Sequence, residues 1–129
     1  MSYYRSRTVK APFEQTIERV VERLKSEGFG ILSDIDVQAT LKSKLDVDVS
    51  EYRILGACNP PFAYQALQAE DKIGTMLPCN VIVQQRGPET TEVSTVDPIA
   101  SMQAVKNPKL AEIAEQVREK LFRAIDRLT

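Results

Sequence analysis

Two Cys-Asn steps, Cys58-Asn59 and Cys79-Asn80, are the residues of this sequence best suited to chemistry. Thiolates bind soft metals such as Cu(I) and zinc, and neighbouring thiols can also act as a reactive or redox pair. Each step lies at the boundary of an apolar, strand-like run, so the thiols would approach each other if the strands are neighbours. The alternative is that both are small buried core residues, as free cysteines commonly are. We favour packing, because no Cys-x-x-Cys spacing accompanies them.

Further polar groups lie at comparable strand ends. Pro60 follows Asn59, and Asp97 follows a later strand-like run. The asparagine amides could hydrogen-bond a small ligand, although such residues more often satisfy the backbone of a turn. Asp97 could face the same rim or cap the loop that follows it. We therefore predict a ligand-binding rim with no catalytic residue and no metal ligand assigned, made of Cys58, Asn59, Pro60, Cys79, Asn80 and Asp97.

The composition excludes several classes of function. The chain has no histidine, which rules out Ser-His-Asp and Cys-His catalysis and histidine-bearing zinc sites. Two cysteines do not make a disulfide framework. Lys and Arg number 17 and Asp and Glu 18, for a net charge of -1. A near-neutral chain lacks the cationic surface that broad nucleic-acid binding requires, so we expect no nucleic-acid partner. We also assign no cofactor.

The N-terminal segment and the hydropathy pattern indicate in which cellular compartment we expect the protein. No apolar core follows the first residues, so we predict no signal peptide. No apolar stretch approaches the roughly 18–20 residues that cross a bilayer. We expect a cytoplasmic protein with reduced thiols and no membrane association, more plausibly a binding protein than an enzyme.

Periodicity predicts the elements of a single domain over residues 1–129. Alternating or compact apolar runs predict strands, and stripes of 3.6-residue period predict helices. Gly28 should end the first helix, Asp36 should cap a short one, and Pro60 or Pro61 should open another. Gly74 should interrupt the segment before Met76. The strands are expected at 3–9, 29–35, 52–58, 79–85 and 90–96, the long helices from 13 to 28 and over 110–128, a turn at 86–89 and a loop at 97–108.

This order predicts a two-layer α+β domain. A hairpin and two long amphipathic helices favour a mostly antiparallel sheet with helices covering one face. The four tyrosines are expected to be packing or interface groups rather than a base-stacking platform, because few cationic residues accompany them. They are Tyr3, Tyr4, Tyr52 and Tyr64.

Several segments, taken in order, resemble a known family. They are the run 52–61 (YRILGACNPP), residues 66–69 (ALQA), 72–74 (KIG), 77–83 (LPCNVIV) and 96–98 (VDP). In this combination the chain is similar to the bacterial and archaeal family catalogued as domain of unknown function 302. The resemblance implies a fold of the TATA-binding-protein type, with a five-stranded sheet in the order strand, helix, four strands, helix and short inserted helices, and it implies a homodimer. It implies no reaction, and a fold of this type does not by itself imply DNA binding.

The sequence leaves three functions open. We favour a non-enzymatic homodimeric module that binds or senses an unidentified small molecule at the predicted rim. The second is a thiol-dependent redox or soft-metal-binding protein. The third is a purely structural or protein-interaction domain without a small-molecule site.

Overall fold

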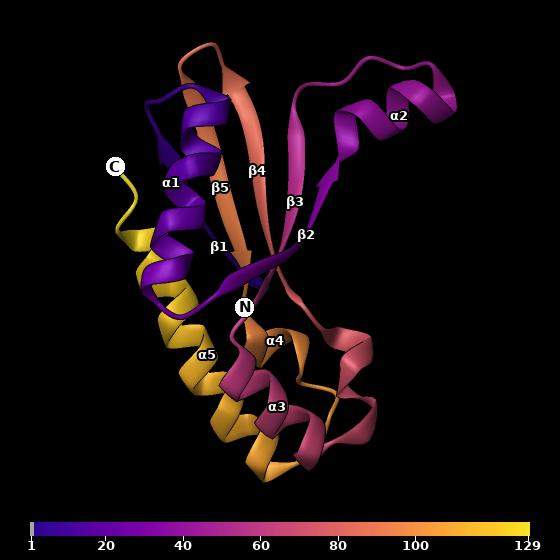
Figure 1. Ribbon diagram of the computed structural model, residues 1–129, viewed down its shortest axis with the longest axis vertical. Coiled ribbons are helices and arrows are strands. Elements are labelled where there is room, and N and C mark those ends of the chain that lie inside the picture. Colours follow the sequence, from indigo (N-terminus) through magenta and orange to yellow (C-terminus); the bar gives the residue numbers. More distant parts are fainter. Residues whose placement is uncertain (1) are drawn as a thin grey trace.

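The computed structural model describes residues 2–129 as five antiparallel strands with two long helices on one face of the sheet (Figure 1). The strand order is β1-β5-β4-β3-β2. This confirms the predicted α+β class, the antiparallel sheet and its helical cover. The strands are β1 (Tyr4–Val9), β2 (Gly30–Asp36), β3 (Tyr52–Cys58), β4 (Cys79–Gly87) and β5 (Thr90–Val96). The helices are α1 (Phe13–Ser26), α2 (Val37–Leu45), α3 (Pro60–Ala69), η1 (Asp71–Met76), α4 (Pro98–Ser101) and α5 (Pro108–Asp126).

The hydrophobic core lies between the sheet and the two long helices. Both helices carry the apolar stripe of 3.6-residue period that a helix needs to bury one side. Leu24 of α1 and Leu121 of α5 are fully buried, as are Val81, Val83 and Val93 on the facing side of the sheet. No helix within residues 2–129 is long and apolar enough to cross a membrane.

The end of α1 follows the sequence prediction. Gly28 has φ +88°, in the left-handed region that favours glycine. Its N–H donates to the Lys25 carbonyl, and the Phe29 N–H donates to the Leu24 carbonyl at 2.9 Å. This bond pair is a Schellman motif, in which an apolar residue after the glycine packs on the last turn. Buried Phe29 completes it and turns the chain into β2.

Three local predictions were wrong. Gly74 does not interrupt its segment, because it lies inside the 3₁₀ helix η1. Part of the predicted loop 97–108 is the short helix α4, started by the Asp97 cap and by Pro98 at its first position. Strand β4 runs to Gly87 through an irregularity after Gln85, so the turn is shorter than predicted. Helices of four to six residues are too short to show a hydrophobic period.

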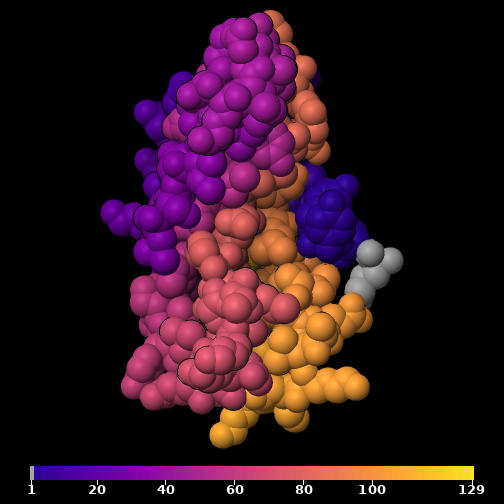
Figure 2. All heavy atoms as spheres, turned by 90° about the vertical axis from the view of Figure 1, so that its right-hand side faces the viewer, coloured from indigo at the N-terminus to yellow at the C-terminus, as the bar shows by residue number. Residues whose placement is uncertain are grey.

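The other face of the sheet carries no helix. Antiparallel pairing sets the residues of neighbouring strands side by side on this face, which we call the open face. Figure 2 looks toward it, with β2, β3, β4, β5 and β1 following one another across the view. One row of paired residues crosses the whole open face: Ile35, Ile54, Ile82, Ser94 and Ser6.

Helix α2 contacts the body of the molecule at β3 and otherwise projects from it. Asp36 caps it as predicted, because its carboxylate accepts a hydrogen bond from the Ala39 N–H at 2.9 Å. None of its nine residues is buried. With the exposed segment that follows, it forms a projection which we call the α2 arm (residues 37–49), and it lies on the open side of the sheet, away from α1 and α5 (Figure 1).

Candidate functional site

Helices α3, α4 and α5 gather at one end of the sheet (Figure 1). Residues of these helices and of the adjoining strand ends line an apolar pocket of about 300 Å³. The ends of β3 and β4 form one part of its wall, and the helices and the segment before β4 form the rest. None of the lining residues identified within 2–129 carries a charge. The lining residues are Phe29, Leu32, Ala57, Cys58, Asn59, Phe62, Ala63, Ala66, Leu67, Gly74, Leu77, Pro78, Cys79, Pro98, Met102, Ile113, Ala114 and Val117.

Cys58 and Cys79 meet at this pocket. Cys79 is the first residue of β4 and pairs with Ala57, the neighbour of Cys58 on β3. Burial raises the pKa of the Cys79 thiol to about 11, and the nearby Cys58 adds to the rise. Burial also raises the pKa of the half-buried Cys58 thiol. Both groups are therefore protonated thiols at neutral pH, which disfavours nucleophilic chemistry.

The surroundings of the two thiols do not complete a metal site. Within residues 2–129, no group of three or more His, Cys, Asp or Glu side chains is placed to hold a metal ion. A thiol must lose its proton to bind a metal, and a raised pKa opposes that loss. The side chains that line this pocket are therefore better suited to an uncharged ligand than to a cation.

Asn59 supplies the polar side chain of the pocket. It is 9% exposed, and its Nδ2 donates to the Glu27 carbonyl at 3.1 Å. This bond ties the end of α1 to the start of α3. The side-chain Oδ1 makes no hydrogen bond to any part of the chain from 2 to 129, and it is not cut off from solvent, because no fully buried side-chain nitrogen or oxygen of these residues lacks a partner. The bond to Glu27 thus fixes the position of the Asn59 side chain, and the Oδ1 is left able to accept a hydrogen bond from a ligand.

Two residues of the predicted rim lie beside the pocket rather than in its wall. Pro60 is the first residue of α3 and is exposed. Asn80 directly follows Cys79 on β4, and successive side chains of a strand point to opposite faces. Asn80 therefore lies on the open face, where it lines a separate groove with Ile82 and Gln84, and the wall of this groove mixes apolar, polar and charged side chains.

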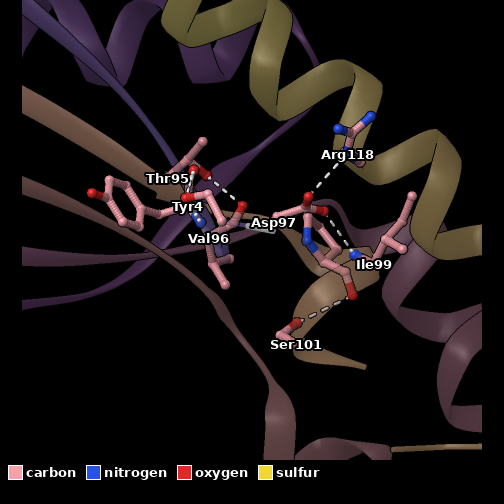
Figure 3. A network of polar contacts seen from close by, with 9 residues as sticks. Tyr4, Thr95, Val96, Asp97, Ile99, Ser101 and Arg118 are labelled. Atoms are coloured by element: carbon pink, nitrogen blue, oxygen red, sulfur yellow. Dashed lines mark hydrogen bonds and ion pairs between the residues drawn. The ribbon is translucent and has the colours of Figure 1, made fainter. Parts of the chain in front are cut away.

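Asp97 is held in a structural network (Figure 3). Its side chain is 7% exposed. One carboxylate oxygen accepts from the Ile99 N–H at 3.0 Å and so caps α4, and the other accepts from Arg118 of α5 at 3.1 Å. Asp97 thereby links the end of β5 to α5 and does not line the pocket. Cys58, Asn59 and Cys79 are thus the members of the predicted rim that the structure brings together in one wall.

Comparison with known proteins supports the family resemblance. The family model described as "Domain of unknown function DUF302" matches residues 5–128. The chain belongs to this family. It is also similar to a solved structure described as an uncharacterized conserved DUF302 protein from Bacillus stearothermophilus. The two are 32% identical over 100% of both chains, with a TM-score of 0.91. A search of curated proteins finds no match.

Most of the residues in the pocket wall of this DUF302 protein were not predicted from the sequence. Phe62 and Leu77 were not among the residues of the predicted rim, and Met102 lay in the loop predicted over 97–108. They come from α3, from the segment before β4 and from the end of α4, so only the fold brings them together. Their common signal is an apolar side chain within a few residues of a proline that starts or ends an element.

Gly56 shapes the same end of the sheet. A Cβ at this position would lie 2.7 Å from the Pro78 Cγ and closer still to the Ser33 Oγ. Gly56 therefore leaves room on β3 for the side chains of Ser33 and Pro78, which a Cβ would displace. The Leu77-Pro78 peptide bond is cis, and both residues line the pocket.

Proposed function

We propose that this protein is a non-enzymatic module that binds or senses a small, uncharged, mostly apolar molecule in the pocket at the ends of β3 and β4. The observation that carries the proposal is the pocket itself, an apolar cavity with no charged group among its lining residues in the described chain. Ligand sites are typically concave and apolar with a few fixed polar groups. The exposed side chains of Leu32 and Leu67 stand at its rim.

The size of the pocket indicates the size of the ligand. A dry cavity of roughly 150 Å³ lined by Leu, Ile and Phe is enough to bind benzene. The present cavity of about 300 Å³ is twice as large. It therefore suits a two-ring aromatic molecule or a medium-length acyl chain.

The Asn59 side chain determines which polar group the ligand should carry. Its Oδ1 is an acceptor without a protein partner among the described residues, and its Nδ2 is occupied by Glu27. A hydroxyl or amide N–H on the ligand would satisfy this acceptor, whereas a charged group would lose its hydration without gaining an ion pair. The preferred ligand is thus an apolar molecule with one neutral hydrogen-bond donor.

The thiols support binding over redox or metal chemistry. Both have raised pKa values, chiefly because they are withdrawn from water. In this proposal Cys58 and Cys79 form part of an apolar wall, as small polarisable side chains commonly do.

A fluorescence titration with 1-naphthol tests the proposal, with 1-naphthalenesulfonate as the charged two-ring control. We expect saturable binding of 1-naphthol and much weaker binding of the sulfonate. Ala63→Phe places a ring in the pocket and should abolish binding. Gln65→Phe adds the same ring to α3 outside the pocket and should leave binding unchanged. Equal binding of both probes, or binding that survives Ala63→Phe in a folded variant, would contradict the proposal.

A further inference from the structure

The chain exposes more surface than a compact protein of its mass. Its accessible area is 7754 Å² for a mass of 14.5 kDa. A folded monomer of this mass is expected to expose roughly 6,900 Å². The excess, on the order of 900 Å², is close to the ~800 Å² that each partner buries in a standard protein–protein interface.

The α2 arm accounts for part of this excess. A helix of nine residues is too short to be stable in water by its own hydrogen bonds, and most helical stability comes from packing of an apolar face. Here no residue of the helix is buried. Leu45 is 66% exposed, and Val47 and Val49 beyond it are also exposed. The arm therefore presents apolar side chains for which the rest of the protomer offers no cover.

The open face also carries apolar side chains that the rest of the protomer leaves uncovered. Ile35, Ile54 and Ile82 stand side by side across β2, β3 and β4. Ile35 is 47% exposed, and the other two are half-buried. Tyr52 and Tyr4 flank this row along the groove of the open face. An apolar row on an uncovered sheet is a typical docking surface for another apolar element.

We propose that the α2 arm of one protomer packs on the open face of a second copy, and that the second copy's arm packs on the first. The arm and the open face lie on the same side of the molecule (Figure 1; Figure 2). One two-fold rotation therefore covers both apolar surfaces in both protomers at once, as an isologous interface requires. The matching excess area favours a second copy over a smaller partner. This interface does not depend on the apolar pocket.

Analytical ultracentrifugation at micromolar concentration tests the arrangement. We expect the wild type to be a dimer. Leu45→Glu on the arm and Ile82→Glu on the open face should each give a folded monomer, because each places a charge in an apolar contact. Tyr64→Glu is the matched control: Tyr64 is 64% exposed but lies on α3, and this variant should remain a dimer.

Mixing the two monomeric variants gives a more specific result. The Leu45→Glu chain keeps an intact open face, and the Ile82→Glu chain keeps an intact arm. Their mixture should therefore recover one arm-to-face contact and form heterodimers at higher concentration than the wild type needs. A mixture that stays monomeric, with each variant folded, would contradict the exchange.

Hydrogen exchange provides a test that needs no substitution. Amide protection of residues 37–45 should rise with protein concentration in the wild type, since the helix is covered only in the dimer. A monomeric wild type, a dimer that survives both glutamate substitutions, or a dimer broken only by Tyr64→Glu would overturn the proposal. Retained 1-naphthol binding by Leu45→Glu would show that the pocket and the interface are separate.

Discussion

Cys58 and Cys79 line one apolar pocket, from the last residue of β3 and the first residue of β4. They are close enough for Cys58 to raise the pKa of the Cys79 thiol further above the value that burial sets. The two cysteines thus lie close together in space. Their burial raises the pKa of both thiols, so both are protonated at neutral pH. This relationship links the strand ends and the pocket to the raised pKa values of both thiols.

The raised pKa of Cys79 predicts a loss of stability at high pH. The thiol has a pKa of about 11 in the folded protein against a reference value of 9.0, so the unfolded chain ionises first. The stabilisation is complete below pH 9 and is lost as the pH rises from 9 to 11. It amounts to about 2 to 3 kcal/mol in the free energy of unfolding.

Urea unfolding at several pH values measures this contribution. Cys79→Ala should lose stability less steeply between pH 9 and 11 than the wild type. Cys58→Ala is the matched control, and it should keep most of the wild-type slope because burial is the larger cause of the shift at Cys79. Identical slopes for Cys79→Ala and the wild type would argue against a buried neutral thiol.

The two thiols should differ in their reaction with iodoacetamide at neutral pH. Cys58 is half-buried and Cys79 is buried, so Cys58 should react slowly and Cys79 only as the protein unfolds. Saturating 1-naphthol should slow the reaction of Cys58 further, because the ligand fills the pocket beside it. Mass spectrometry of the modified peptides over time measures both rates, with urea-unfolded protein as the reference. Rapid modification of Cys79 in the folded state would favour the thiol-dependent alternative.

Gly56→Ala should lower the free energy of unfolding by about 1 to 3 kcal/mol, as overpacking commonly does. The added methyl group meets Ser33 and Pro78. Gly30→Ala is the control, because a Cβ there has no neighbour within 4 Å. Thermal and urea unfolding should show little change for Gly30→Ala. If Gly56→Ala were equally neutral, the close packing of Ser33 and Pro78 against Gly56 would be wrong.

Substitution of Asp97 separates its two structural roles. Asp97→Ala removes both the cap of α4 and the partner of Arg118, and should cost about 1 to 3 kcal/mol in the free energy of unfolding. Asp97→Asn keeps an oxygen for the cap and should cost about 1 kcal/mol or less, since Arg118 is 42% exposed and can reach water. Neither change should alter 1-naphthol binding. Loss of 1-naphthol binding in folded Asp97→Asn would indicate that the Asp97 carboxylate takes part in ligand binding after all.

The sequence predicts the regular elements better than the site. The stripe of α5 and the glycine that ends α1 are local signals, and both predictions are confirmed. The predicted rim placed Asn80 together with Cys79, and the structure separates them, because neighbours on a strand face opposite sides. By contrast, the bond of Asp97 to Arg118 and the meeting of Phe62 with Met102 depend on packing between elements distant in the chain. No pattern in one segment reports such contacts.

A crystal structure of the protein with 4-bromo-1-naphthol is the most direct test of the proposed function, because the anomalous signal of bromine locates the ligand without reference to the protein density. We predict a bromine peak among Phe62, Leu77 and Met102, with the hydroxyl directed at the Asn59 Oδ1. A peak in the groove of the open face beside Asn80, or no peak from crystals soaked at a saturating concentration, would contradict the account.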